Sequence, residues 1–476
     1  MRGVWHTERV KAAEEELMAV VPPGSLMRKA AFGVATHALR LLGGRRRVTL
    51  LVGAGNNGGD ALWAGYFLRR RGVSVSAVLL APEKAHVEAL AAFRRVGGRI
   101  VTEVGSPDLV IDGIVGLSAR GPLRPAAADL VASVSAPILA VDLPSGIDPD
   151  TGEISGPHVH AHTTVTFGCL KPVHALADCG EVHLVDIGLR PSDPDFVLLD
   201  RSDVRWPVPG PSDDKYTQGV TGVAAGSSAY PGAAVLSTGA AVLATSGMVR
   251  YAGPAADAIR ARWPEAVCTG SITDAGRVQA WAVGPGMGTG SSSAEVLRFV
   301  LDAGVPVIAD ADAITLLASQ PSLWDARDPD AALVLTPHDR EFERLAGPVG
   351  SDRVAAARKA AQRFNAVVLL KGHRTVVAAP DGRALVNSAT SSWPATAGSG
   401  DVLSGIIGAL LASGLDPFLA AGYAAYTHVL AAELGANGAP LPASGLMEAI
   451  PDAIRTILSV PSGRIESGDP LEGTPA

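Results

Sequence analysis

The sequence predicts an α/β fold in two domains, each a three-layer sandwich around a parallel sheet. At 476 residues the chain is too long for one ordinary hydrophobic core. Apolar runs of strand length alternate with helical runs, which is typical of parallel sheets. The alternation pauses at RWPVPGPSDDKYTQG (205–219) and then begins again. We therefore expect one domain over residues 1–207, a second over 208–462 and a disordered polar tail over 463–476.

The composition excludes several classes of protein. A formal net charge of −7 argues against nucleic acid as the main partner. The three cysteines lack the paired spacing of a metal site and suggest no disulfide framework, so we expect a reducing, cytoplasmic location. The first 18 residues form a charged amphipathic pattern rather than a signal peptide, and no apolar run is long enough for a membrane span. We expect small-molecule substrates and a homo-oligomer.

The first half supplies the elements of one parallel, doubly wound sheet. In such a sheet, ligands bind at the carboxyl ends of the strands. The expected strands are VTLLV (48–52), VSVSAVLLA (73–81), DLVIDGIVG (108–116), APILAVDLPSG (136–146) and HTTVTFG (162–168), and the expected helices are DALWAGYFLRRRG (60–72) and HVEALAAFRRVGG (86–98).

The loop after the first of these strands has a phosphate-binding pattern. Gly53, Gly55 and Gly58 satisfy G-x-G-x-x-G, whose glycines let a backbone approach a pyrophosphate. An NAD-dependent dehydrogenase is therefore one alternative, but the acid that would bind the ribose is only weakly present, as Glu83. A glycine turn without a ligand is another alternative, which the backbone entropy lost by three glycines disfavours.

The asparagines of the same loop indicate a cation. Asn56 and Asn57 both offer side-chain carbonyl oxygens, which are ligands that hard cations prefer. Asp112, Asp142 and Ser145 follow the ends of two other strands, and these strand ends could lie side by side at one edge of the sheet. A cation there would partly neutralise the carboxylates beside an anion-binding loop.

Three motifs in this order, GNNGGD (55–60), DGIVGLSARGP (112–122) and DLPSGID (142–148), resemble the NAD(P)H-hydrate epimerase domain over about residues 8–200. The resemblance implies a Rossmann-like sheet that binds hydrated NADH or NADPH and interconverts its R and S epimers at the hydrated ring carbon, with a bound potassium ion. Asp142 is the implied acid–base residue, and Asn57, Asp112 and Ser145 are the implied potassium ligands. The implied substrate contacts are Asp142 together with Asn56, Asn57, Gly58, Gly59, Asp60, Gly116, Leu117, Ser118, Ala119, Arg120, Gly121 and Pro122.

The first half has one departure from that family's pattern and one further candidate metal site. Ala61 stands where the family has a further glycine, and we expect only a small effect. HVHAH (158–162) could bring three histidines to one strand face as a metal site. We favour instead a polar strand face that leads into TVTFG.

The second half repeats the alternation and ends in a glycine-rich helix start. In AGSGD (397–401), small residues leave backbone N–H groups free as an anion hole, and Asp401 follows as a base toward a hydroxyl group. Phosphoryl transfer needs both features, whereas a glycine-rich helix entry without function is the alternative. The expected strands lie in VTGVAAGSS (220–228), AWAVGPGMG (280–288), VPVIADADA (305–313), LVLTPHDREF (333–342) and AVVLLKGHRTVV (366–377), and the expected helices are PGAAVLSTGAAVLATSG (231–247) and AGSGDVLSGIIGALLASG (397–414).

GSSAYPGAA (226–234), GPGMG (284–288), LTPHDREFERL (335–345), KGHRTVV (371–377) and AGSGDVLSG (397–405) resemble the ADP-dependent NAD(P)H-hydrate dehydratase of the ribokinase-like fold, over about residues 212–460. The resemblance implies that ADP with Mg²⁺ activates the hydroxyl group of the S hydrate as a phosphate ester. Elimination then restores the nicotinamide and releases AMP and phosphate. Asp401 is the implied catalytic base, and Glu341 is an implied carboxylate near the phosphates that helps to hold magnesium. The implied hydrate contacts are Ala234, Gly286, Gly288, His338 and Asp401, and the implied nucleotide contacts are Lys371, Gly372, His373, Arg374, Thr375 and Gly400.

Some residues of the second half leave alternatives open. His338 has a second interpretation as a helix-capping or core histidine. Trp393 and Ala397 depart from the dehydratase pattern, which concerns the shape of the substrate pocket more than the reaction. The alternative function is a small-alcohol kinase, for a sugar or vitamin, fused to a dinucleotide-sensing module. Three intact acids, Asp60, Asp112 and Asp142, argue against a first half that only senses.

Overall fold

The computed structural model describes residues 1–459 except residues 119, 246 and 390. It divides into an N-terminal domain, Arg2–Leu198, and a C-terminal domain that begins at Leu199 and includes Met1. The sequence placed the boundary after residue 207, in the same irregular stretch before β10 (Val220–Ala224). The predicted tail over 463–476 lies outside the described residues. Within the described ranges, no helix is both long and apolar enough to cross a bilayer.

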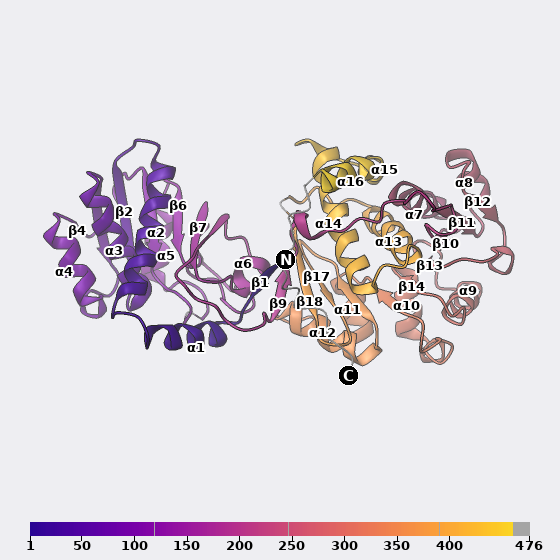
Figure 1. The fold of residues 1–476 in the computed structure, drawn as a ribbon, viewed down its shortest axis with the longest axis horizontal. Helices are drawn as coiled ribbons and strands as arrows, with labels where there is room; N and C mark the ends of the chain where they lie inside the picture. Colours follow the sequence, from indigo (N-terminus) through magenta and orange to yellow (C-terminus); the bar gives the residue numbers. More distant parts are fainter. Residues whose placement is uncertain (119, 246, 390, 460–476) are drawn as a thin grey trace. The chain divides into compact units, whose positions relative to one another are not determined.

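The N-terminal domain is built on a sheet of parallel strands in the order β4-β3-β2-β5-β6-β7-β8 (Figure 1). The five predicted strands are present, so the predicted parallel sheet is confirmed. Two short strands near the ends of the domain, β1 and β9, pair antiparallel. The strands are β1 (Arg2–Val4), β2 (Arg47–Val52), β3 (Ser74–Leu79), β4 (Arg99–Val101), β5 (Leu109–Gly113), β6 (Ile138–Val141), β7 (Thr163–Phe167), β8 (Glu181–Val185) and β9 (Phe196–Leu198).

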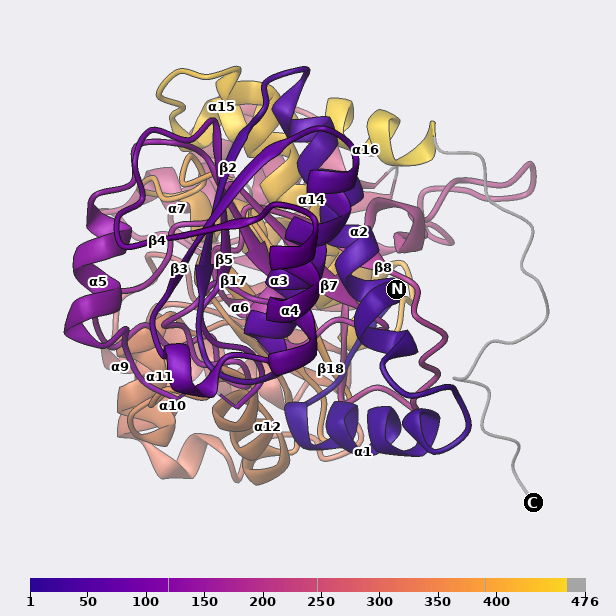
Figure 2. The ribbon, with the colours of Figure 1, turned by 90° about the vertical axis from the view of Figure 1, so that its left-hand side faces the viewer.

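Helices cover both faces of this sheet, because alternate residues of a strand point to opposite faces. In β2, Leu50 and Val52 join the core under α2 and α3, whereas Leu51 joins the core under α5. Figure 2 shows α3 and α5 on opposite sides of the strands. The helices are α1 (Thr7–Met18), α2 (Ser25–Leu42), α3 (Asn56–Arg70), η1 (Pro82–Lys84), α4 (Val87–Arg95), α5 (Pro125–Ala132) and α6 (Pro172–Leu176).

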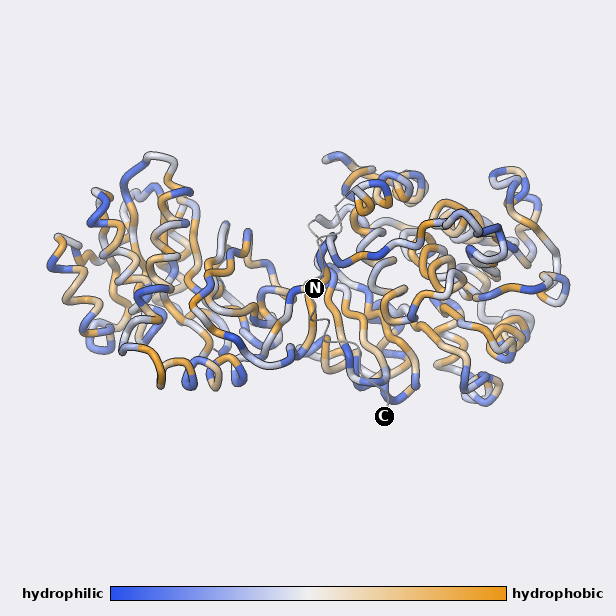
Figure 3. Tube along the Cα trace, viewed as in Figure 1, coloured by the Kyte–Doolittle hydropathy of each residue, from blue (hydrophilic) through white to orange (hydrophobic). Residues whose placement is uncertain are grey.

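The predicted amphipathic helix near the N-terminus is α1. Figure 3 shows apolar and polar residues alternating along it. Thr7 and Val10 are buried on its inward face, and Glu15 and Glu16 are exposed on the outward face. The helix therefore packs on the domain along one stripe, as its spacing predicts.

The C-terminal domain has its own sheet, in the order β18-β17-β16-β15-β14-β13-β10-β11-β12. The strands from β16 to β12 in this order are parallel, whereas β17 and β18 are antiparallel additions at one end. The single predicted run AVVLLKGHRTVV is thus two strands, and Lys371 lies in the turn between them. The strands are β10 (Val220–Ala224), β11 (Met248–Ala252), β12 (Val267–Thr269), β13 (Ala280–Val283), β14 (Val307–Ala309), β15 (Leu333–Leu335), β16 (Val367–Leu370), β17 (Arg374–Ala378) and β18 (Ala384–Ser388).

Figure 1 shows α7, α13 and α14 on one face of this sheet and α9 to α12 on the other. Small residues let α7 and α13 approach closely, since a Cβ at Gly405 would lie 2.2 Å from the carbonyl oxygen of Ser237. The helices are η2 (Arg201–Asp203), α7 (Pro231–Ala244), α8 (Ala256–Arg262), η3 (Ile272–Asp274), α9 (Ser291–Leu301), α10 (Asp312–Ser319), η4 (Pro321–Leu323), α11 (Asp339–Ala346), α12 (Arg353–Phe364), α13 (Ser399–Ala412), α14 (Pro417–Ala436), α15 (Ala443–Glu448) and α16 (Ile450–Leu458).

Candidate functional site

Each sheet changes its winding direction at one place, between β2 and β5 in the N-terminal domain and between β10 and β13 in the C-terminal domain. Ligands of open parallel sheets bind in the crevice at such a point, beyond the carboxyl ends of the strands. The glycine loops over 53–58 and 284–288 follow β2 and β13. The fold therefore provides one candidate site in each domain.

In the N-terminal domain, the glycines let the loop meet the neighbouring strand. A Cβ at Gly53 would lie 1.8 Å from the carbonyl oxygen of Ile114, and a Cβ at Gly113 would lie 2.5 Å from the Cβ of Ala61. Ala61 is fully buried. The methyl group that departs from the epimerase pattern is therefore accommodated because Gly113 opposite it has no side chain.

The predicted cation ligands Asn57, Asp112 and Ser145, which we call the oxygen cluster, lie together. The carboxylate of Asp112 accepts hydrogen bonds from Ser145 Oγ at 2.8 Å and from the backbone N–H of Ser145 at 2.9 Å. Asn57 Nδ2 donates to the carbonyl oxygen of Val115 at 2.8 Å, so its Oδ1 is left for another partner. Burial raises the pKa of Asp112 to about 6, although the hydrogen bonds from Ser145 oppose the shift. A buried carboxylate of this kind is stabilised by a cation.

Asp142 follows β6 and is paired with a buried lysine that the sequence analysis missed. Lys171 Nζ lies 2.7 Å from Asp142 Oδ1 and also donates to Thr166 Oγ1 at 2.8 Å. Burial alone would raise the pKa of Asp142, but the charge of Lys171 and its hydrogen bond outweigh burial and hold the pKa below its usual value. Asp142 also has a φ of +67°, a conformation that is strained for most residues. It is therefore an ionised carboxylate held in one orientation.

His174 fixes the backbone of the same residue. The N–H of Lys171 donates to His174 Nδ1 at 2.9 Å, so Nε2 carries the proton and donates to the carbonyl oxygen of Asp142 at 2.7 Å. Burial lowers the pKa of His174 to about 4, which keeps the ring neutral. The histidine thus stabilises the strained turn rather than offering a metal ligand.

Asp60 lies in the second turn of α3, and its pKa is shifted in the opposite direction from that of Asp142. Its Oδ1 is buried without a hydrogen-bond partner among the described residues. Burial raises its pKa well above the usual value, and the charge of Asp142 adds to the shift. The pKa values of the two aspartates are therefore shifted in opposite directions.

The second predicted substrate loop, 116–122, begins beside the oxygen cluster. A Cβ at Gly116 would lie 3.2 Å from Asn57 Cβ. Ser118 is exposed, and Ala119 lies outside the described residues. The first residue of the loop is therefore brought to the candidate site.

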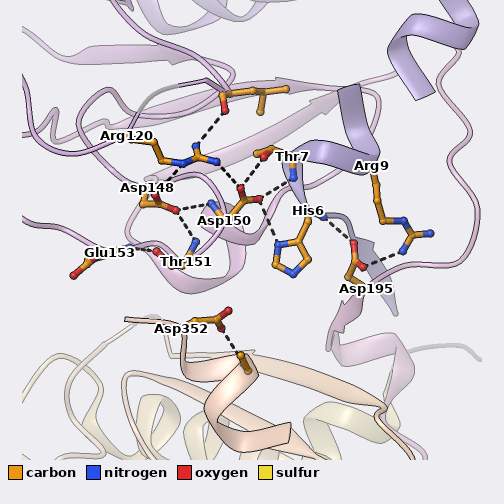
Figure 4. Close-up of polar contacts among 12 residues, drawn as sticks. His6, Thr7, Arg9, Arg120, Asp148, Asp150, Thr151, Glu153, Asp195 and Asp352 are labelled. Carbon is orange, nitrogen blue, oxygen red and sulfur yellow. Dashed lines mark hydrogen bonds and ion pairs between the residues drawn. The ribbon is translucent and has the colours of Figure 1, made fainter. Parts of the chain in front are cut away.

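Arg120 of this loop belongs to a polar network that Figure 4 shows. Its guanidinium lies 2.9 Å from Asp150 Oδ2 and 3.6 Å from Asp148 Oδ2. Asp150 also accepts hydrogen bonds from the N–H of Thr7 at 2.8 Å and from Thr7 Oγ1 at 2.7 Å. One carboxylate thus connects the loop to the start of α1.

The expectation for HVHAH is wrong in its secondary structure. Residues 158–162 precede β7, which begins at Thr163. The ring centroids of His158 and His160 lie 4.3 Å apart. His162 Nδ1 accepts a hydrogen bond from the backbone N–H of Ile138 at 3.2 Å. Within the described part of the chain, no group of three His, Cys, Asp or Glu side chains could hold a metal. Each of the three histidines thus has a contact with a neighbouring ring or backbone group.

The candidate site of the C-terminal domain is a cavity of about 560 Å³. Most of the predicted residues line it, whereas Ala234, Gly286, Gly288 and Arg374 do not. The segment that departs from the dehydratase pattern also forms part of the wall, through Pro394 and Ala395. The predicted residues that line the cavity are His338, Glu341, Lys371, Gly372, His373, Thr375, Gly400 and Asp401.

An ion pair between a half-buried lysine and a buried aspartate lies at this cavity. Lys371 Nζ is 2.6 Å from Asp310 Oδ1 and 3.6 Å from Glu341 Oε2. Ser404 Oγ of α13 donates to Asp310 Oδ2 at 2.8 Å, which fixes the carboxylate. Burial alone would lower the pKa of Lys371, but the charges of Asp310 and Glu341 outweigh it and raise the pKa. The ammonium group is therefore charged at the wall of the cavity.

Asp401 stands in the first turn of α13, after Gly398, whose φ is +86°. Burial raises its pKa to about 6, the charge of Asp310 adds to the shift, and Lys371 opposes it. The first turn of a helix presents free N–H groups. A carboxylate of nearly neutral pKa and a helix start with free N–H groups thus share one cavity.

His338 caps a helix, as its second interpretation proposed. Its Nδ1 accepts the N–H groups of Arg340 at 3.1 Å and Glu341 at 3.2 Å, and Glu341 Oε2 accepts the N–H of His338 at 2.9 Å. The ring also lines the cavity. The cap holds Glu341 at the start of α11 and close to Lys371.

Four residues of these sites were not predicted from the sequence: Lys171, Asp310, Ser404 and His428. His428 Nε2 lies 3.0 Å from both Ser399 Oγ and the carbonyl oxygen of Ser399, at the start of α13. A signal existed for Lys171, as a charge inside the apolar run TFGCLKPV, and for Asp310, directly after a buried strand.

Comparisons with known proteins match both halves of the chain. Residues 23–173 match the family described as YjeF-related protein N-terminus, and residues 221–452 match the NAD(P)H-hydrate dehydratase family. A bifunctional NAD(P)H-hydrate repair enzyme from Mycobacterium leprae is 56 % identical over 96 % of this chain and 100 % of its own. One from Mycobacterium tuberculosis H37Rv is 59 % identical over 87 % of this chain and 90 % of its own. Among solved structures, a ribokinase-like superfamily protein from Enterococcus faecalis is 25 % identical, with a TM-score of 0.50, over 55 % of this chain and 96 % of its own.

Proposed function

The chain belongs to the family of bifunctional NAD(P)H-hydrate repair enzymes, and on this premise we propose that its domains divide the two activities. The N-terminal domain interconverts the R and S epimers of hydrated NADH or NADPH. The C-terminal domain dehydrates the S epimer at the expense of ADP, giving NAD(P)H, AMP and phosphate. Hydroxide is a poor leaving group and phosphate a good one, which is the chemical reason for using a nucleotide.

In the C-terminal cavity, we propose Asp401 as the base for phosphoryl transfer. Its carboxylate takes the proton of the substrate hydroxyl group, whose oxygen attacks the terminal phosphorus of ADP while the bond to AMP breaks. The free N–H groups at the start of α13 and the ammonium group of Lys371 stabilise the charge on the transferred phosphoryl group. Elimination of the phosphate ester then restores the nicotinamide ring.

Carboxylates at the cavity fit a magnesium ion that enters with the nucleotide. Mg²⁺ prefers oxygen ligands and substrate phosphates. Glu341 and Asp310, which lie with Lys371 at the cavity, are the side chains that would face it. When bound, the ion would neutralise phosphate charge.

In the N-terminal domain, the oxygen cluster fits a potassium ion. Amide, hydroxyl and carboxylate oxygens are hard ligands, and a cation would stabilise the buried negative charge of Asp112. Asn57, Asp112 and Ser145 would hold it, and it would stabilise the loop beside them. Asp142, held ionised by Lys171, is the base for epimerisation.

The observation that carries the proposal is the pairing, in one cavity, of Asp401 with the charged Lys371 at a helix start. Reciprocal variants test it. Asp401→Asn should lower dehydration of the S hydrate by about 10²-fold or more, while chromatography still shows R and S interconverting. Asp142→Asn should do the reverse. Near wild-type dehydration by Asp401→Asn would mean that the base is another residue. If the wild-type protein released a product that keeps the phosphoryl group, the small-alcohol kinase would be favoured instead.

We also infer a cytoplasmic homo-oligomer whose partners are small molecules rather than nucleic acid or membranes. The cysteine content, the net charge and the lack of a long apolar run in the sequence support the location and the partners. Size-exclusion chromatography with light scattering measures the oligomeric state.

A further inference from the structure

The carboxylate of Asp142 has one occupied oxygen and one free oxygen. Its Oδ1 accepts hydrogen bonds from Lys171 Nζ at 2.7 Å and from Thr166 Oγ1 at 2.9 Å. Within the described residues, its Oδ2 makes no hydrogen bond or ion pair, and the side chain is 10 % exposed. A base needs an oxygen that is free to take a proton and is held in place. Oδ2 is therefore the oxygen of Asp142 that is available to a substrate.

The chemistry of the groups around Oδ1 fixes the direction of each hydrogen bond. An ammonium group only donates, and an ionised carboxylate only accepts. Thr166 Oγ1 therefore accepts a hydrogen bond from Lys171 Nζ at 2.8 Å and donates its single proton to Asp142 Oδ1. Lys171 also donates to the carbonyl oxygen of Phe167 at 3.1 Å. The hydroxyl proton of Thr166 thus has one acceptor, the carboxylate of Asp142.

The pairing of β6 with β7 places Thr166 beside Asp142. Val141 lies opposite Val165, and the N–H of Asp142 donates to the carbonyl oxygen of Val165 at 2.8 Å. The ladder therefore continues one residue past the end of β6. Thr166 is fully buried, and its β-branched side chain is restricted at χ1. The donor is thus fixed by the sheet rather than by a mobile loop.

The backbone of Asp142 is held on both sides, so the torsions of its side chain decide where Oδ2 lies. Its N–H is bound to Val165, and its carbonyl oxygen accepts from His174 Nε2 at 2.7 Å. The terminal torsion of an aspartate, χ2, is broad and would let the carboxylate turn. Two donors on Oδ1 oppose that rotation, because turning the group would break both hydrogen bonds. Holding Oδ1 therefore also fixes Oδ2.

We propose that Thr166 is a positioning residue of the epimerase site, whose hydroxyl group holds Asp142 Oδ1 so that Oδ2 faces the substrate. This inference rests on the epimerase activity and on the base proposed above. Thr166 acts only through Asp142 and neither takes nor gives up a proton in the reaction. Its part resembles that of the third group of a catalytic triad, which holds the base in its working orientation.

Full-length variants test this role. Conversion of the pure R hydrate to S is followed by chromatography without ADP, and the spontaneous rate is subtracted. Thr166→Val keeps the shape of the side chain but removes the donor. Its kcat should fall by about tenfold or more while KM changes by less than about twofold, because the substrate contacts remain and only the position of the base is lost. Thr166→Ser keeps the hydroxyl group and should recover most of the rate.

Thr164 provides the matched control. It lies on the same face of β7, is fully buried and donates its hydroxyl proton to the carbonyl oxygen of Cys179 at 2.7 Å. Thr164→Val therefore removes a buried hydrogen bond from the same strand and keeps both donors to Asp142. Its kcat should lie within about twofold of wild type. Hydrogen exchange of peptides from β6 and β7 shows whether each variant keeps the sheet.

A Thr166→Val kcat within about twofold of wild type would overturn the proposal. Equal losses in Thr166→Val and Thr166→Ser, or in Thr166→Val and Thr164→Val, would also overturn it and indicate packing. If Thr166→Val does not keep the sheet, Thr166→Cys replaces it with the same expected fall in kcat, because a thiol is a weak donor. Absence of conversion by the wild type would instead refute the proposed epimerase, and full activity of Asp142→Asn would refute the proposed base.

Discussion

Replacing Lys171 by methionine removes the partner of a buried carboxylate while nearly conserving volume. The lysine side chain is only 1 % exposed, and its ammonium group contacts Asp142 Oδ1, Thr166 Oγ1 and the carbonyl oxygen of Phe167 at 2.7–3.1 Å. Methionine is flexible and fills such a space well. Lys171→Met therefore tests the charge of Lys171 more than its packing.

The expected loss in the free energy of unfolding is about 3–5 kcal/mol near pH 8, the usual result of leaving one buried charge unpaired. In the wild type, the pKa of Asp142 in the folded state lies below its unfolded value of about 3.9. The contribution of Asp142 to the free energy of unfolding is therefore fully present above the unfolded value. It is lost as the pH falls through the folded-state pKa. In the variant, burial raises the pKa above the unfolded value, so destabilisation grows as pH rises past about 4. The difference between the two proteins should therefore shrink toward pH 4.

Hydrogen exchange of peptides from β6 and β7, followed by mass spectrometry, measures this stability within the full-length chain. The matched control is the double variant Lys171→Met/Asp142→Asn, which removes both charges and should regain most of the loss. A loss of equal size at pH 5 and pH 8, or a double variant no better than the single one, would refute the electrostatic reasoning and indicate packing instead.

Exchange of potassium for lithium should lower the interconversion of R and S by about tenfold, the effect of losing about 1.4 kcal/mol of stabilisation, and should leave dehydration unchanged. No effect of the cation in a chromatographic assay would contradict the role of the oxygen cluster. Dehydration of the S hydrate should fall as pH drops below about 6, because burial raises the pKa of Asp401 to that value and the base must be ionised. A rate that stays constant between pH 5 and pH 8 would exclude Asp401 as the base.

Much of the N-terminal site could be predicted from the sequence because parallel strands end at one edge of a sheet. Asn57 and Ser145 follow β2 and β6, and Asp112 lies near the end of β5, so their meeting needs only the predicted topology. Lys171 could not be assigned in this way, because a lysine is exposed unless something buried balances its charge. That partner, Asp142, is distant in sequence, so only tertiary structure shows the pair.

In the C-terminal domain, prediction of the site from the sequence is limited for the same reason. Asp401 and the helix start are local in sequence and were predicted together. Asp310 was missed because its significance lies in its contacts with Lys371 and Ser404 from two other elements. The sequence predicts helix α1 as amphipathic, and only the packing of Ala13 and Leu17 against the core shows which face points inward.

The most direct test of two activities in one chain uses a mixture of R and S NADH-hydrate, with Mg²⁺ and potassium present. The recovery of NADH absorbance is followed with ADP and without nucleotide. The account predicts complete recovery with ADP, including the half that began as the R epimer, and only the slow spontaneous rate without nucleotide. Recovery that stops at the S fraction would contradict the epimerase assignment, and no recovery would contradict the dehydratase.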